Sequence, residues 1–228
     1  MCLILLSLEV QPEFPLILAA NRDEYYARPT EAAHLWEDGV LAGRDLRSGG
    51  TWLGWREGRW AAVTNYRETE PTRDGAPSRG QLVLKFLRGQ QTPAEFLSEI
   101  AQSGQTYAGF NLLFGVETEV FSTSNRGPGE QVGPGVHGLS NHLLNTPWPK
   151  VVAGREALRA SGDGLDTLEW LREDSIPPGD GPLGAVFIRT PEYGTRCSTL
   201  LRRDSGGGWL FVERRYRGLE WEESHYQM

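Results

Sequence analysis

The stretch that decides the fold runs from residue 1 to residue 29 and reads MCLILLSLEVQPEFPLILAANRDEYYARP. It contains two apolar runs, CLILLSLEV at 2–10 and FPLILAANRD at 14–23, which the polar triplet QPE separates. Runs this rich in Leu and Ile predict strands, and so short a connection predicts an antiparallel hairpin. The first run is almost continuously apolar, as expected of a strand that is covered on both faces.

This hairpin has a chemical consequence at its open end. The end of the second strand returns beside the start of the first, so we expect the polar group at its end to lie close to Cys2. That group is Asn21, Arg22, Asp23 and Glu24. If Met1 is removed, Cys2 carries both a thiol and the α-amine of the chain. The amine can then act as the general base for the thiol of its own residue, because their ordinary pKa values lie at ~7.7–8.0 and ~8.5.

Other side chains complete a hypothetical acyl-transfer site. Asp23 would hold the ammonium group or orient a substrate. Asn65 in AVTNYR and Asn141 in GLSNHLLNTPWPK carry amides that can donate to a developing oxyanion. Arg196 in YGTRCSTLL can bind a carboxylate or a phosphate with two hydrogen bonds. In a regular strand Arg196 and Cys197 face opposite sides, so we do not expect both in one site.

Two plainer interpretations stay open at this point. Cysteine is a common small apolar residue in strands, so Cys2 can simply be buried. The tetrapeptide NRDE can form a strand-end turn in which Asn and Asp bond the backbone and Arg pairs with Glu on the surface.

The remaining sequence predicts an α+β protein with antiparallel sheets. Gly49 and Gly50 lead into two strands that the REG turn joins, and Thr92 with Glu95 forms a capping box. We expect strands at 51–55, 59–66, 110–116, 119–125, 184–190, 194–203 and 209–216, helices at 78–89, 92–104, 148–161 and 164–174, and a turn region at 127–135. Strands and helices follow one another in blocks, which is typical of layered α+β domains and not of doubly wound folds.

Composition narrows the class of protein. The chain has 228 residues, which suits one domain spanning 1–228, and its net charge is −7. This charge argues against nucleic acid or an anionic membrane as a partner bound by bulk charge. The 2 cysteines are too few for a disulfide framework or a zinc cluster. The opening apolar run is short and lacks a basic flank, so we expect no signal peptide, no membrane span and a cytoplasmic location.

Five motifs in order resemble one family. They are MC at the start, NRDE, GGTWLG, SNHLLNTPWPK and YGTRCSTLL. Together they resemble the NRDE family, which includes the transport and Golgi organisation protein 2 homologues of eukaryotes and is similar to cysteine-type N-terminal nucleophile (Ntn) hydrolases. The resemblance implies a four-layer αββα sandwich with two antiparallel sheets.

The same resemblance implies roles for particular residues. Cys2 would be the nucleophile, Asp23 its acidic partner, Asn141 a donor of the oxyanion hole and Arg196 the late active-site arginine. Asn21 and Arg22 would take part of the role that an arginine plays there in the hydrolases. This chain departs from the hydrolase pattern because its Arg22 stands directly before the aspartate.

Two functions follow as hypotheses. The first is hydrolysis or transfer of an acyl group from a non-peptide amide or thioester, with no cofactor required and a small molecule as the substrate. The second is binding and trafficking of haem or of an acyl-CoA or lipid on the same fold, without catalysis. Trp52 and its neighbours would then line the pocket, and an arginine would hold a propionate or phosphate.

The histidines at 34, 137, 142 and 225 have no spacing diagnostic of a haem ligand. The sequence leaves the oligomeric state open.

Overall fold

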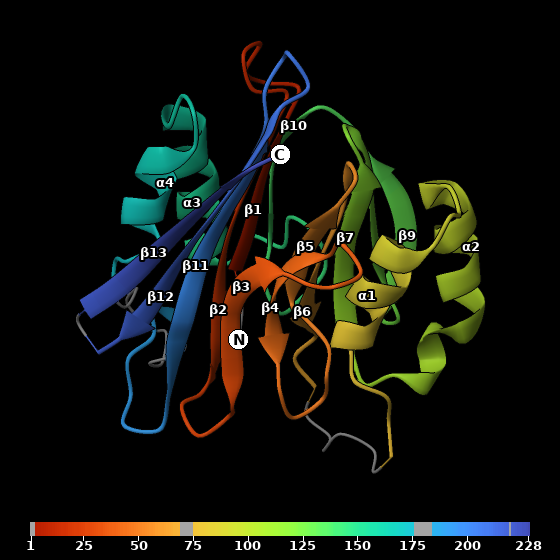
Figure 1. Ribbon diagram of the computed structural model, residues 1–228, viewed down its shortest axis with the longest axis horizontal. Helices are drawn as coiled ribbons and strands as arrows, with labels where there is room; N and C mark the ends of the chain where they lie inside the picture. Colours follow the sequence, from red (N-terminus) through yellow and green to blue (C-terminus); the bar gives the residue numbers. More distant parts are fainter. Residues whose placement is uncertain (1–2, 69–74, 176–183, 219) are drawn as a thin grey trace. The chain divides into compact units, whose positions relative to one another are not determined.

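The computed structural model describes residues 3–68, 75–175, 184–218 and 220–228 (Figure 1). The chain forms two compact units. The first unit comprises 1–27, 134–140 and 145–228, and the second comprises 28–133 and 141–144. Each unit combines one antiparallel sheet with helices, so the predicted α+β class with two antiparallel sheets is confirmed.

The first unit is built on a 6-stranded sheet in the order β10-β1-β2-β11-β12-β13. Its strands are β1 (Leu3–Leu8), β2 (Leu16–Tyr25), β10 (Gly135–Leu139), β11 (Tyr193–Arg203), β12 (Trp209–Arg217) and β13 (Glu220–Gln227). The helices α3 (Pro149–Ala160) and α4 (Leu165–Trp170) contact β1, β10 and β11. The predicted hairpin of the first two strands is confirmed, since β1 pairs antiparallel with β2.

The core of this unit lies between the sheet and its two helices. Leu3 and Leu5 of β1 pack with Ile17 of β2, Leu200 of β11 and Leu158 of α3. Residues with this two-residue spacing share one face of a strand. We call the side that faces α3 and α4 the helix face and the opposite side the far face. All 6 residues of β1 are buried, as its continuous apolar pattern predicts.

The second unit is built on a 7-stranded sheet in the order β3-β4-β5-β6-β7-β8-β9. Its strands are β3 (Thr30–Leu35), β4 (Leu41–Asp45), β5 (Leu53–Arg56), β6 (Arg59–Asn65), β7 (Phe110–Val116), β8 (Glu119–Ser124) and β9 (Gly127–Val132). The helix α1 (Gly80–Arg88) packs on β5, β6 and β7, and α2 (Pro93–Ser103) packs on β7 and β8. A 3₁₀ turn, η1 (Gly104–Thr106), follows α2.

Local sequence explains the elements of the second unit. The side chain of Thr92 accepts a hydrogen bond from the backbone of Glu95 and the carboxylate of Glu95 accepts one from the backbone of Thr92, so the predicted capping box is confirmed. The rings of Phe86, Phe96 and Phe114 contact one another at centroid distances of 5.0–5.2 Å. In the predicted REG turn, Gly58 has a φ of +77°, which glycine adopts without steric cost.

Some predictions at the ends of the sheets are wrong. The region 127–135 contains β9 and the start of β10 instead of turns alone, and β3, β4 and β13 were not predicted. These strands lie at or next to a sheet edge, and in β9 and β13 exposed residues weaken the apolar signal. The predicted strand at 184–190 forms only one bridge, Arg189 with Gly194. The stacking of four layers and the single domain spanning 1–228 stay predictions.

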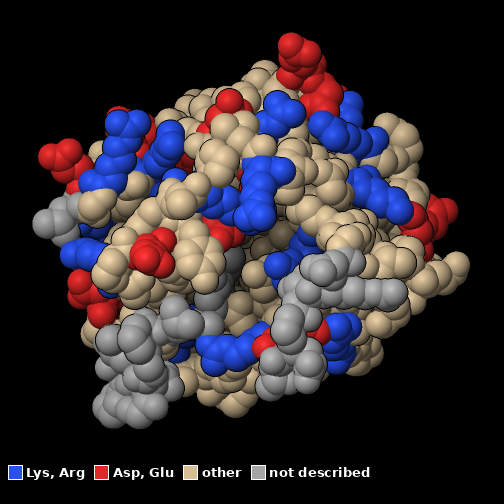
Figure 2. All heavy atoms as spheres, turned by 90° about the horizontal axis from the view of Figure 1, so that it is seen from below, with Lys and Arg blue, Asp and Glu red and all other residues tan. Residues whose placement is uncertain are grey.

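Two surface features bear on possible partners. None of the helices within the described ranges is long and apolar enough to cross a membrane. Figure 2 shows Lys and Arg side chains spread over one face among Asp and Glu, although the net charge is −7. Positive charge is therefore available locally on an acidic protein.

Candidate functional site at the ends of strands β2 and β11

The polar tetrapeptide NRDE ends strand β2 between β1 and β11. Leu3, the first described residue, pairs with Asn21, and Asn21 pairs in turn with Ser198 of β11. The prediction that the end of the second strand returns beside the start of the chain is therefore confirmed. Cys2 itself lies outside the described residues.

Asn21 is buried on the helix face, and its amide is engaged within the protein. It donates to the carbonyl oxygens of Leu171 at 2.8 Å and Val186 at 2.9 Å, and its Oδ1 accepts from Ser198 at 2.5 Å. These bonds attach two segments that follow α4 to the centre of the sheet. This arrangement supports a structural role for Asn21, so we leave it out of the function proposed below.

Asp23 follows on the same face and is the buried acid of the site. Its side chain accepts a hydrogen bond of 2.6 Å from Thr195 Oγ1, and its backbone carbonyl accepts one of 3.1 Å from the Tyr193 hydroxyl. Burial raises the pKa of Asp23 above its ordinary range. The hydrogen bond from Thr195 and the positive charges of Lys150 and Arg22 act in the opposite direction on the same pKa. Burial therefore favours the neutral carboxyl form of Asp23, and these neighbours favour its carboxylate form.

Lys150 is a component that the sequence analysis missed. It is only 4% exposed and its charge acts on Asp23. Val151, Gly154 and Leu158 are buried along the same helix α3. A lysine at a position of the buried stripe, in the first turn where the helix dipole disfavours a cation, is the sequence signal that could have found it.

The far face of the same strands carries basic side chains. Arg22 on β2 and Arg215 on β12 both lie directly opposite Cys197 of β11. Side chains directly opposite each other in an antiparallel pair are about 4.5–5.5 Å apart at Cβ. Arg22 is 5% exposed and Cys197, a free cysteine, is 4% exposed. Cys197 therefore lies between two arginines of neighbouring strands, and we call Arg22, Arg215 and the nearby Arg196 the arginine row.

Arg196 joins this row because the strand is irregular there. A β-bulge between Thr195 and Cys197 makes Arg196 the extra residue of β11. The two-residue alternation breaks at a bulge, so our expectation that Arg196 and Cys197 serve opposite faces is wrong. Burial lowers the pKa of Arg196, the charges of Arg22 and Arg215 lower it further, and those of Cys197 and Glu24 raise it.

Arg196 and Glu24 also bind the nearby backbone. One guanidinium nitrogen of Arg196 donates to the carbonyl oxygens of Tyr25 at 2.9 Å and Tyr26 at 3.3 Å. Glu24 accepts a hydrogen bond of 2.9 Å from the backbone N–H of Tyr25. Arg196 is thus held at the end of β2 by the chain that continues from NRDE.

Three predicted residues belong to the second unit. The Asn141 side chain donates to the backbone carbonyl of Asn65 at 2.9 Å, while the side chain of Asn65 is exposed. The Trp52 ring rests on strand β4, because a Cβ added at Gly43 would lie 2.4 Å from it. Trp60 is fully buried, so it belongs to the core of this unit. The roles predicted for Asn65, Asn141 and Trp52 stay predictions.

The histidines are scattered over the chain. Each contacts a different neighbour: His34 the Ala32 carbonyl, His137 the side chain of Asn145, His142 the ring of Tyr66, and His225 the carboxylate of Glu223. Within the described residues no group of 3 or more His, Cys, Asp or Glu side chains is arranged to hold a metal ion. The predicted haem site is not tested by these contacts.

The fold and the site define an α+β protein of two antiparallel sheets with a buried acid and an arginine row at one strand end. Comparison with known proteins places it more closely. The chain belongs to the family described as Transport and Golgi organisation 2, which it matches over residues 1–218. The resemblance that the five motifs indicated is thereby confirmed at the level of the family.

Several curated relatives match over the full chain. The bovine Transport and Golgi organization protein 2 homolog is 35% identical over 272 residues, which cover 100% of this chain and 98% of the bovine one. The human homolog is 33% identical with the same coverage of both chains. Transport and Golgi organization protein 2 of Drosophila melanogaster is 28% identical, again over 100% of this chain and 98% of its own.

Proposed function

We propose that this protein is a cysteine hydrolase or acyltransferase of the Ntn type that acts on a non-peptide amide or thioester in the cytoplasm. The observation that carries the proposal is the pairing of Leu3 with Asn21. Cys2 is bonded to Leu3, so their Cα atoms are about 3.8 Å apart. The chain therefore enters the sheet beside the strand end that bears Arg22 and Asp23.

The proposed reaction needs the residues in distinct roles. With Met1 removed, the α-amine of Cys2 takes the thiol proton, and the thiolate attacks the acyl carbon of the substrate. The leaving amine or thiol departs with that proton, which leaves an acyl thioester on Cys2. Water then hydrolyses the thioester and restores the thiol. Asp23 is the acid that would hold the ammonium group, and the positive charge of Lys150, which lowers the pKa of Asp23 against the effect of burial, supports its carboxylate form in this role.

The arginine row supports a substrate that carries an anionic group. Arg22 and Arg215 lie opposite Cys197 on the far face, and the charges of both lower the pKa of Arg196. Arginine binds carboxylates and phosphates with two parallel hydrogen bonds. Asn141 is the proposed donor to the oxyanion, as the family resemblance implies.

The same row supports a second function. A protein that binds haem or an acyl-CoA needs cations for propionate or phosphate groups but no nucleophile. Arg22 and Arg196 would supply these cations, with Trp52 proposed as part of a pocket wall. The binding protein and the enzyme differ in whether Cys2 is needed.

The first test compares the two cysteines. Intact mass of the purified protein, before and after a limiting dose of iodoacetamide, reports whether Met1 is removed and which thiol reacts. We expect a mass lacking Met1 and alkylation at Cys2, with Cys197→Ala as the matched control that keeps this reaction. Retained Met1 with an unreactive Cys2 contradicts the enzymatic proposal.

The second test separates catalysis from binding. We expect a thioester or amide screen to find turnover that Cys2→Ala abolishes and Cys197→Ala retains. If Cys2→Ala instead keeps the affinity of the protein for haem or an acyl-CoA, and no turnover is found in either form, the binding function replaces the enzyme.

A further inference from the structure

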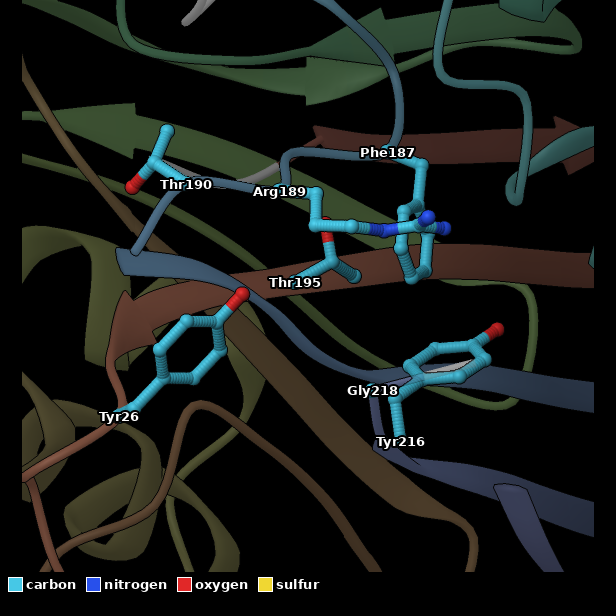
Figure 3. Close-up of a pocket in the computed structure, with 7 residues that line it drawn as sticks. All are labelled: Tyr26, Phe187, Arg189, Thr190, Thr195, Tyr216 and Gly218. Atoms are coloured by element: carbon cyan, nitrogen blue, oxygen red, sulfur yellow. The ribbon is translucent and has the colours of Figure 1, made fainter. Parts of the chain in front are cut away.

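A cavity opens on the first unit beside the end of strand β11. It has a volume of about 310 Å³ and is lined by Tyr26, Phe187, Arg189, Thr190, Thr195, Tyr216 and Gly218 (Figure 3). An apolar cavity of about 150 Å³ already admits a benzene ring, and small-molecule sites begin near 300 Å³. The cavity therefore has room for a molecule of one or two rings.

Aromatic rings form its inner wall. Phe187 and Tyr216 are 5% and 9% exposed, and their rings meet edge to face with centroids 4.8 Å apart. Tyr26 stands at the rim with 41% of its surface exposed. Its ring lies so close to strand β11 that a Cβ added at Gly194 would come within 2.1 Å of the hydroxyl oxygen. Walls of this kind favour flat aromatic ligands, because ring pairs gain about 0.5–1.5 kcal/mol beyond their buried area.

Three hydroxyl groups of the wall, those of Thr190, Thr195 and Tyr216, already donate to protein partners. Thr195 donates to Asp23 at 2.6 Å and Thr190 donates to the Tyr193 carbonyl at 2.7 Å. Ser198 gives its single proton to Asn21, so in the 2.8 Å bond between Ser198 and Tyr216 the tyrosine is the donor. Burial raises the pKa of Tyr216 to about 12, which keeps that proton in place at neutral pH.

Arg189 is the charged group of the cavity. Its guanidinium carbon lies 5.5 Å from the centroid of the Phe187 ring, and Figure 3 shows its side chain running alongside that ring. The side chain is 46% exposed, and its ion pair with Asp174 is 3.9 Å long and solvent-accessible on both sides. Such a pair contributes about 0–1 kcal/mol, so a ligand anion can displace it.

We propose that this cavity binds a small aromatic acid, with the ring against Phe187, Tyr216 and Tyr26 and the carboxylate or phosphate on Arg189. The site is separate from the arginine row, because its wall is on the helix face whereas the row is on the far face, and it adjoins Asp23 of the proposed catalytic site. Its occupant would lie against Thr195, whose hydroxyl donates to Asp23.

Calorimetric titration with 2-naphthoate tests the proposal. We expect saturable binding to the full chain, and binding at least about tenfold weaker for the neutral isostere 2-naphthamide, because a hydrogen bond to a charged group is lost. Titration with 2-naphthyl phosphate shows which of the two anions the site prefers. Equal affinity for 2-naphthoate and 2-naphthamide, or no saturable binding of either acid, overturns the proposal.

Variants locate the binding. Arg189→Met should weaken 2-naphthoate about tenfold. Arg159→Met is the matched control, since Arg159 is also 46% exposed and pairs with one carboxylate, and it should change nothing.

Tyr26→Ala removes a half-exposed wall and should weaken both acids several-fold. Cys2→Ala should bind normally, so failure of the catalytic proposal leaves this one intact. Equal losses in Arg189→Met and Arg159→Met would place the ligand elsewhere and overturn the assignment.

Discussion

The two faces of strands β2 and β11 carry polar residues in different ways. On the helix face, Asn21, Asp23, Thr195 and Ser198 bond one another and the backbone of neighbouring segments. On the far face, arginines from three neighbouring strands gather around Cys197. Alternate residues of the NRDE tetrapeptide therefore lie on opposite faces of the sheet, in a hydrogen-bonded network on one face and in the arginine row on the other.

This difference separates structure from function within a single motif. A buried polar group whose hydrogen bonds are satisfied inside the protein mainly specifies the fold. A cluster of arginines supplies positive charge that can attract an anionic ligand. The hydrogen bonds of Asn21 therefore support a structural role, whereas recognition of an anion by Arg22 remains part of the proposed function, although the two residues are adjacent in sequence.

The largest expected effect follows from breaking the helix-face network. Asn21→Ala removes three hydrogen bonds and leaves the buried carbonyls of Leu171 and Val186 without their amide donor. We expect a loss of about 3–5 kcal/mol in the free energy of unfolding, measured by urea denaturation.

Asn65→Ala is the matched control for this experiment. Its side chain is exposed at the end of β6, and its bond to Asn141 uses the backbone carbonyl. We expect a change within about 0.5 kcal/mol. Similar losses in both variants would contradict the structural role of Asn21 and return it to the candidate ligand-binding residues.

The sequence predicted the fold where patterns are local. Hairpins such as β5–β6 and helices such as α2 follow from turn residues, capping residues and apolar spacing, and they were found. The segment 184–190 was mistaken for a strand: it forms one isolated bridge, and side chains of other segments supply two of its hydrogen bonds. Val186 accepts from Asn21, and the Ile188 N–H donates to Thr195 Oγ1. Long-range side-chain bonds of this kind leave no periodic signal.

The candidate site was predictable only in part. Register alone brings the NRDE end of β2 beside Leu3, and the hairpin pattern was enough to predict that. The bulge at Arg196 could not be predicted, because it depends on how β11 pairs with β2. Arg215 was also missed, because it becomes part of the row only through its pairing with Cys197.

Arg214 and Arg215 offer a sharper comparison, since these neighbours point to opposite faces of β12. Arg214 is 13% exposed, lies 2.6 Å from Glu169 and also pairs with Glu223. Arg215 lies in the row with Arg196, whose pKa its charge lowers. We expect Arg214→Met to lose about 1–2 kcal/mol in urea denaturation. We expect Arg215→Met to lose less, because it also removes the charge that lowers the pKa of Arg196.

The dependence of stability on ionic strength further distinguishes Arg214→Met from Arg215→Met. The loss in Arg214→Met should shrink at high ionic strength, because ion pairs that are partly exposed are screened. Arg215→Met should instead weaken any anion that the arginine row binds. Equal destabilisation by both substitutions would show that the faces do not differ as described.

The smallest effect concerns the pH dependence of stability at Asp23. Because burial raises its pKa in the folded protein, the folded state holds the proton more tightly than the unfolded chain. The contribution of Asp23 to stability is therefore greatest below the ordinary aspartate pKa of about 3.9 and falls as pH rises toward the raised value. We expect the stability of the wild type relative to Asp23→Asn to fall across this window.

Thr195→Val provides the comparison for this dependence of stability on pH. The hydrogen bond from Thr195 lowers the pKa of Asp23, so its removal should raise that pKa further and extend the fall to higher pH. Each unit of pKa corresponds to about 1.4 kcal/mol in the free energy of unfolding. The measurement is urea denaturation of the three proteins at a series of pH values. A relative stability that rises with pH would mean that the positive charges acting on Asp23 outweigh burial, so that its pKa is lowered in the folded protein and its carboxylate form is favoured.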